Sequence, residues 1–130
     1  MDRLMSGGPW ASARARASIR GYPQPGGNFV LPTLDSVKAA AAAVATDMPH
    51  DFRVSITDSS GQDAYPISSF TWLLVPTRFA DADKGKAMKS FLVWILDDGQ
   101  KLAPPLLYAP LPAQVINLER DAIASVQVGP

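Results

Sequence analysis

The chain has 130 residues, 47% of them hydrophobic, and its 12 basic and 12 acidic residues give a formal net charge of zero. This length allows one modest core, and the balanced charge favours neither nucleic acid, nor acidic substrates, nor membrane surfaces. The absence of cysteine excludes disulfides and thiolate metal sites, and the single histidine, His50, argues against most histidine-based catalysis and most zinc sites.

Residues 1–25 are predicted to form an irregular leader. Paired glycines at 7–8 and 26–27 and several prolines interrupt every helical or strand period in this part of the chain. The leader contains arginines but no apolar run of about 7–15 residues, so it does not resemble a secretory signal. A short extended piece is expected at residues 28–31.

A first helix is expected to begin after Thr33, whose hydroxyl can cap it, with Asp35 in the first turn, where the helix dipole favours an anion. Residues 38–46 are almost all alanine, the best helix former. Small side chains permit close approach, so this helix is expected to pack tightly on a sheet. Met48 and Pro49 are expected to end it.

Two strands are expected next. Apolar and polar residues alternate from 52 to 57, and again from 65, with Phe70, Trp72 and Leu74 on one face. By residues 73–75 the second segment is apolar on both faces. This pattern is typical of a central strand, so we expect that end to be buried.

Two further helices follow. Asp81 or Asp83 is expected to open the second helix, and Gly99 to stop it. Prolines at 104, 105, 110 and 112 predict a loop over residues 103–112, and Pro112 suits the first position of a third helix. Three helices around a few strands indicate an incomplete α/β sheet whose missing strands come from elsewhere.

Four segments, in order, resemble the phosphate-specific solute-binding proteins of ABC importers, within the periplasmic-binding-protein class. They are residues 27–41, 63–75 with Tyr65-Pro66-Ile67, 84–94 with Lys84-Gly85-Lys86-Ala87, and 99–112 with Tyr108-Ala109-Pro110-Leu111-Pro112. Each segment alone is a weak signal, but together they cover residues 26–126. The resemblance is to the carboxyl-terminal part of the family only.

The resemblance implies a partial type II-like periplasmic-binding-protein fold over residues 26–130, taken from a two-lobed α/β protein that closes on phosphate by a hinge. It also implies inorganic phosphate as the family ligand, permease and ATPase subunits of an importer as partners, and a periplasmic or cell-surface location. No cofactor, metal, nucleic acid or enzymatic activity is expected.

In the family, phosphate is held by loops and helix starts of the first half and by a Ser-Gly-Thr-type loop near the middle, with an arginine and an aspartate. This chain contains no Ser-Gly-Thr triplet, and residues 1–17 resemble nothing in the family. No phosphate ligand is therefore carried over. Pro104 and Pro105 also depart from the family, which continues a helix there.

Ser68, Ser69 and Thr71 are the candidate phosphate-binding residues within the matched part. The favoured interpretation is that these hydroxyls line the polar side of a strand that crosses between lobes. Arg53 and Arg78 are candidates for attracting an anion, although solvated surface positions are favoured for both.

Trp72 and Trp94 lie on apolar stripes and are expected in the core rather than against a ligand. His50 follows Pro49 in a turn and is expected at the surface.

Three functions follow from these patterns. The first is a fragment of a phosphate receptor that does not bind phosphate alone. The second is an interaction module or remnant that completes its sheet with another chain. The third, an enzyme, is disfavoured because the sequence offers no histidine–nucleophile pair and no metal cluster. An unmatched leader before a good match is also typical of a frameshift or a misplaced start.

Overall fold

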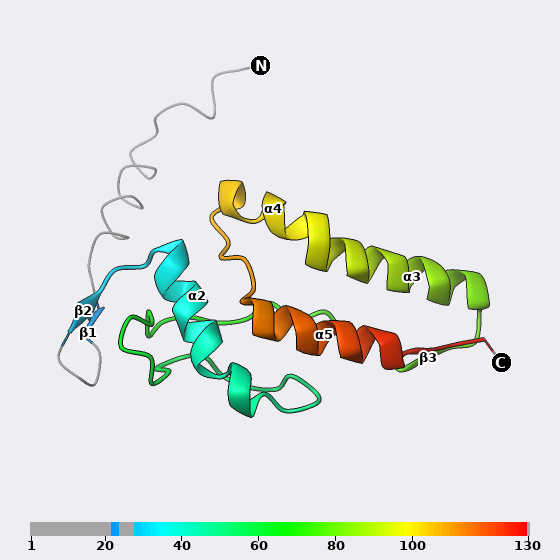
Figure 1. Cartoon of the computed structure of the whole chain (residues 1–130), viewed down its shortest axis with the longest axis horizontal. Coiled ribbons are helices and arrows are strands. Elements are labelled where there is room, and N and C mark those ends of the chain that lie inside the picture. Colours follow the sequence, from blue (N-terminus) through cyan, green and yellow to red (C-terminus); the bar gives the residue numbers. More distant parts are fainter. Residues whose placement is uncertain (1–21, 24–27, 130) are drawn as a thin grey trace, which may run out of the picture.

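A computed structural model gives the structure of the chain and describes residues 22–23 and 28–129. Three longer helices and four two-residue strands make up this part of the chain (Figure 1). The helices are α2 (Leu34–Ala43), α3 (Ala82–Trp94) and α5 (Ala113–Ser125). The expected mixture of about three helices with an incomplete sheet is confirmed. Most of the leader at 1–25 lies outside the described residues, so its irregular structure stays a prediction.

The strands form two separate, minimal sheets. β1 (Tyr22–Pro23) pairs antiparallel with β2 (Phe29–Val30), and β3 (Arg78–Phe79) pairs parallel with β4 (Gln127–Val128). The extended piece expected at residues 28–31 corresponds to β2. The β3–β4 ladder joins segments about fifty residues apart and places the carboxyl-terminal strand beside the chain that enters α3 (Figure 1).

Helix α2 begins where its capping residue predicts. The Thr33 hydroxyl accepts a hydrogen bond from the Ser36 backbone N–H at 3.1 Å, and the Ser36 hydroxyl accepts one from the Thr33 N–H at 2.9 Å. This reciprocal pair satisfies two amides that the first helical turn leaves without partners. After Ala43 the chain makes a 3₁₀ turn (Ala45–Asp47), so the helix ends slightly before the expected Met48.

The alanine face of α2 forms part of a small core. Ala40 and Ala41 pack with Ile56 and Ala64, and these four side chains are at most 5% exposed. A Cβ built on Gly61 would lie 3.5 Å from the Ala43 Cβ and 3.7 Å from the Ala39 carbonyl oxygen, which shows how closely this loop approaches the helix. The expected close approach therefore occurs, but the partner is an irregular segment and not a sheet.

The two strands expected at 52–57 and 65–75 do not form. In the described chain three isolated hydrogen bonds join them: Asp58 N–H to Pro66 O at 2.8 Å, Thr57 hydroxyl to Ser68 O at 3.0 Å, and Trp72 Nε1–H to Phe52 O at 3.1 Å. Phe52 and Asp58 have φ of 57° and 56°, outside the strand region, so the first segment is bent at both ends. The segments therefore lie side by side without a ladder.

The burial expected for the end of the second strand is also wrong. Leu73 is 61% exposed and Leu74 is 95% exposed. The apolar pattern of residues 73–75 requires neighbours on both edges and cover on both faces. The described part of the chain supplies neither.

Helix α3 begins at its expected cap but does not stop where predicted. The Asp81 carboxylate accepts hydrogen bonds from the Asp83 and Lys84 amides at 3.0 and 3.1 Å. Gly99 has φ of −59° and lies in a π-helical turn (Ile95–Gly99) that runs on into the short helix α4 (Gln100–Leu102). Because this glycine does not adopt the left-handed conformation of a helix stop, the helical rod continues past it.

The rod ends at the prolines instead. A 3₁₀ turn (Pro104–Leu106) follows α4, and Leu107 reverses the chain with φ of 63°. Pro112 occupies the N-cap position of α5 and makes no side-chain cap hydrogen bond. It was predicted at the first helical position, which Ala113 occupies instead. The loop expected over residues 103–112 is otherwise confirmed.

Helices α3 and α5 run antiparallel beside each other and carry the β3–β4 ladder at one end (Figure 1). Gly85 allows α3 to approach this ladder, because a Cβ there would lie 2.8 Å from the Val128 Cγ1 and 3.0 Å from the Phe79 Cβ. The buried Val115 anchors the first turns of α5, at 1% exposure.

Candidate functional site

The candidate hydroxyls lie in the extended part of the chain that follows the Ile56 core. Ser68 is buried, and its hydroxyl donates to the Tyr65 carbonyl at 2.7 Å. The Ser69 hydroxyl donates to the Phe70 carbonyl at 3.2 Å. Thr71 is exposed, and within the described ranges its hydroxyl makes no hydrogen bond. Their role in phosphate binding stays a prediction.

The candidate basic residues do not bind these hydroxyls in the described part of the chain. Arg53 pairs with Asp51 at 3.5 Å, and both side chains are more than half exposed. Arg78 is exposed on β3, and His50 is exposed in a turn. For the part of the chain that is described, no hydrogen bond or ion pair joins either arginine to Ser68, Ser69 or Thr71.

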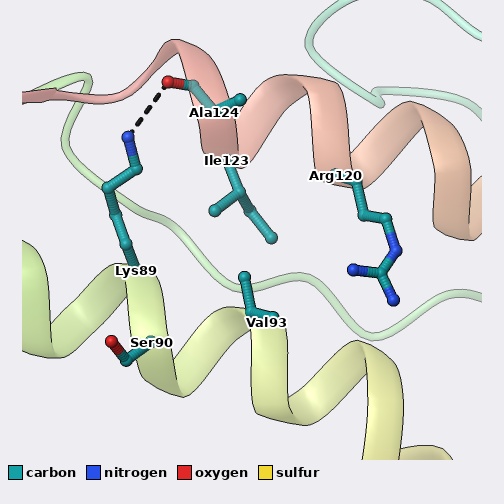
Figure 2. A pocket seen from close by; sticks show the side chains of 6 residues that line it. All are labelled: Lys89, Ser90, Val93, Arg120, Ile123 and Ala124. Carbon is teal, nitrogen blue, oxygen red and sulfur yellow. Dashed lines mark hydrogen bonds between the residues drawn. The ribbon is translucent and has the colours of Figure 1, made fainter.

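One hollow lies between α3 and α5 (Figure 2). It has a volume of about 370 Å³ and is lined by Lys89, Ser90, Val93, Arg120, Ile123 and Ala124. The two cationic side chains come from different helices, which is the kind of arrangement that attracts an anion. Both, however, are already engaged by groups of the protein.

Lys89 binds the end of α5. Its ammonium donates to the Ala124 carbonyl at 3.0 Å (Figure 2) and to the Val126 carbonyl, also at 3.0 Å. The last carbonyls of a helix have no partners within the helix and carry its negative dipole end, so a cation there is favourable. The last turn of α5 has no basic residue of its own. Lys89 of α3 thus places a positive charge at the last turn of α5, which has none of its own.

Arg120, on the other side of the hollow, pairs with Asp97 in the π-helical turn. The next residue, Asp98, accepts a hydrogen bond from Lys101 at 2.7 Å. That hydrogen bond and the nearby charge raise the pKa of the Lys101 ammonium. The hollow therefore offers an anion no uncommitted cation. Helical spacing alone would place Lys89 on the solvent side of α3, so its bonds to α5 could not be predicted from the sequence.

Glu119, also on α5, has an altered pKa. Partial burial removes water from its carboxyl group and raises the pKa above its ordinary value of 4.5. No hydrogen bond or ion pair of the described residues involves this carboxyl. A single carboxyl group without a polar partner in the described chain does not form a binding site.

Large apolar side chains are exposed over much of the surface, which sequence patterns did not reveal. Trp72 and Trp94, both expected in the core, are 50% and 44% exposed. Trp94 stacks on Phe91, which is itself 51% exposed. Such side chains normally mark an interaction surface.

Residues 22–23 and 28–129 contain neither a candidate metal cluster nor a candidate membrane span. No group of three or more His, Cys, Asp or Glu residues there could hold a metal ion. No helix in those ranges is both long and apolar enough to cross a membrane.

No family model matches the chain. It is similar to the phosphate-binding protein PstS of Xylella fastidiosa strain Temecula1, with 36% identity over 91 residues, which cover 70% of this chain and 25% of that protein. The PstS protein of Methanocaldococcus jannaschii is 36% identical over 115 residues, covering 78% of this chain and 29% of the relative. The PstS protein of Pasteurella multocida is 29% identical over 108 residues, covering 83% and 29%.

This chain spans between a quarter and a third of the length of these relatives. All three are named as binding proteins and not as enzymes, in agreement with the expectation from the sequence. The similarity extends over most of the chain and corresponds to a carboxyl-terminal part of the relatives. By sequence, the chain therefore belongs with the phosphate-binding proteins, as a match to their carboxyl-terminal part.

Proposed function

We propose that the chain is the carboxyl-terminal scaffold part of the phosphate-receptor subunit of an ABC phosphate importer. In this proposal the helices and the extended segments are part of a type II-like periplasmic-binding-protein fold, located in the periplasm or at the cell surface. Inorganic phosphate is the ligand of the whole receptor, and the permease and ATPase subunits are its partners. The chain does not bind phosphate by itself.

The similarity to proteins named for phosphate binding, over only part of their length, is the observation that carries this proposal. The local chemistry agrees with it. Anion capture requires converging N–H groups, hydroxyls and guanidinium groups. Ser68 and Ser69 instead donate to carbonyls of the chain, and Arg53 pairs with Asp51.

The helix starts support the same conclusion. The first amides of α2 are capped by Thr33, and those of α3 by the Asp81 carboxylate. A carboxylate at the start of α3 repels an anion that would otherwise be attracted by the helix dipole. In two of the three longer helices, the caps thus occupy amides that an anion at the helix start would use.

Isothermal titration calorimetry of the 130-residue chain with inorganic phosphate tests the proposal. We expect no saturable heat at micromolar concentrations, while the full-length Xylella fastidiosa relative serves as the positive control. Micromolar binding by this chain alone would refute the proposal. In that event, Ser68→Ala and Thr71→Val show whether the candidate hydroxyls hold the ligand, with Ser125→Ala on α5 as a matched hydroxyl control.

A second candidate function is supported by the exposure of Trp72, Leu73 and Leu74. In this alternative the chain is an interaction module, or a remnant, that completes its sheet with another chain. Exposed apolar strand-like segments favour association. A clean soluble monomer in size-exclusion chromatography with light scattering, across a wide concentration range, would count against it.

A further inference from the structure

One side of helix α3 is both apolar and open. Ala87, Phe91 and Trp94 follow one another at intervals of three or four residues, so they share one face of the helix. All three are exposed, and Phe91 and Trp94 are 51% and 44% exposed. The buried residues of α3, Gly85 and Leu92, lie on another face. Much of this side, which we call the aromatic face, is thus open in the described part of the chain.

The aromatic face has both a protrusion and a recess. The rings of Phe91 and Trp94 stack, with centroids 6.0 Å apart and an angle of 16° between their planes. Beside them lies a second hollow, of about 380 Å³. It is lined by Phe79, Lys84, Ala87, Met88 and Phe91, most of which are apolar. A stacked aromatic pair next to an apolar hollow is suited to contact another aromatic surface.

The charges along the helical rod have an order that reverses about Phe91. Lys84 comes seven residues before Phe91, and Asp98 comes seven residues after it. Asp81 and Lys101 each lie ten residues from Phe91, again with opposite charges. All four charged side chains are exposed, and each pairs within its own end of the rod, Lys84 with Asp81 at 3.9 Å and Lys101 with Asp98 at 2.7 Å. Turned end for end, the rod presents the opposite charge at each of these positions.

We propose that the aromatic face binds a second copy of this chain, with the two α3 helices antiparallel and the two Phe91 side chains near a two-fold axis. In that arrangement Lys84 comes level with the partner's Asp98, and Asp81 comes level with the partner's Lys101. An isologous contact uses one surface twice, so a charge order that reverses about its centre is complementary to itself. This inference does not rest on the proposed function.

A second copy fits these features better than an unrelated partner. An unrelated protein needs an apolar surface opposite Phe91 and Trp94, but it does not need charges that are balanced about Phe91. A parallel pair of α3 helices is disfavoured as well, because it would place Lys84 level with the partner's Lys84, and like charges repel. The reversal of charge about Phe91 therefore selects both the partner and the direction of the contact.

Sedimentation velocity of the 130-residue chain, from about 1 to about 300 µM, tests the inference. We expect a reversible equilibrium between monomer and dimer in this range, because a contact made by a single helix face is small. Trp94→Ala removes the largest side chain of the aromatic face and should weaken the dimer at least about tenfold. Phe29→Ala is the control, since Phe29 is 74% exposed on β2 and should leave the equilibrium unchanged. Far-UV circular dichroism shows that each variant keeps its helices.

Charge reversal tests the direction of the contact. Lys84→Glu and Asp98→Lys each place like charges level with one another at two symmetric points, so each should weaken the dimer about tenfold. A one-to-one mixture of the two variants should restore the affinity of the parent chain. In the mixed dimer the new glutamate faces the new lysine, and the unchanged Lys84 faces the partner's unchanged Asp98. Mixing cannot repair damage within either chain, so the restored affinity reports the contact between them. Lys38→Glu, at an exposed position of α2, is the control for net charge and should have no effect.

A monomer at every concentration would overturn the inference, whether the aromatic face stays open or is covered by residues 1–21 of the same chain. A dimer that neither Trp94→Ala nor the charge reversals weaken would also overturn it, and would place the contact elsewhere, as at the exposed residues 72–74. Failure of the mixture to restore the affinity would overturn the antiparallel pairing. Phosphate calorimetry is independent of these outcomes, since it tests the proposed function and not the aromatic face.

Discussion

Replacing Lys89 by Met tests the contact that joins α3 to α5. The substitution removes the ammonium and keeps an unbranched side chain of similar length and good helix propensity. Two hydrogen bonds, from Lys89 Nζ to the Ala124 and Val126 carbonyls, are lost. The last turn of α5 then has no positive charge against its dipole.

The size of the effect follows from the geometry of the contact. Hydrogen bonds that involve a charged group contribute about 1.5–3 kcal/mol when well shielded, but Lys89 is only partly buried. Holding a lysine side chain in one conformation costs up to about 2 kcal/mol of rotamer entropy. A net loss of about 1 kcal/mol is expected, corresponding to a decrease in Tm of about 4 °C for a domain of this size.

Urea and thermal unfolding, followed by far-UV circular dichroism, measure this loss. Lys86→Met is the matched control, because Lys86 lies exposed on the same helix, and in the described part of the chain it makes no side-chain hydrogen bond or ion pair. The control should stay within about 0.5 kcal/mol of the parent chain. The difference between the variants should shrink in about 1 M salt, because screening weakens partly exposed charge contacts. Equal stability of Lys89→Met and Lys86→Met would refute this account of the α3–α5 contact.

Two further predictions concern the same helical pair. Gly85→Ala should destabilise the chain although alanine is the better helix former by about 1 kcal/mol, because the new Cβ would lie 2.8 Å from the Val128 Cγ1 and 3.0 Å from the Phe79 Cβ. Val128→Ala in the same chain should recover part of that loss, and a Gly85→Ala variant more stable than the parent in urea would show that β4 moves away freely. Glu119→Gln should stabilise the chain at neutral pH. Burial raises the folded-state pKa of Glu119 above 4.5, so the stability of the parent chain falls as the pH rises from about 4.5 through that raised pKa. The gain should vanish well below pH 4.5, and an equal, pH-independent gain in the control Asp121→Asn would contradict the assignment to Glu119.

Helix starts were predictable because their signals are local. Thr33 and Asp81 cap α2 and α3 through hydrogen bonds to residues two or three positions along the chain. A cap is readable from sequence because its partners are fixed by that short spacing. The end of the α3 rod was not predictable from Gly99, since a glycine stops a helix only if it adopts a left-handed conformation, and here its φ is −59°.

Strands were not predictable in the same way, because a strand is defined by its neighbours. Residues 52–57 and 65–75 have the alternation of strands, yet they form no ladder in the described chain. Burial of Leu73 and Leu74 was inferred from a pattern that presupposes a larger sheet, and with no such sheet both side chains are exposed. For the candidate site, the pattern supplied hydroxyls at Ser68 and Ser69, but the carbonyls to which they donate depend on the folded path of the chain.

Long-range contacts of the described chain gather in two packing units, before and after residues 71–76, and α2 contacts α5 between them. On one side, α2 packs against Ile56 and Ala64. On the other, the β3–β4 ladder pairs the chain just before α3 with the chain just after α5, and Lys89 of α3 donates a hydrogen bond to the last turn of α5. Residues 71–76 carry large apolar side chains but belong to neither packing unit. Because the backbone of residues 71–75 makes no hydrogen bond within the described chain, loss of the Lys89 bonds should weaken the α3–α5 unit without changing amide exchange at those residues.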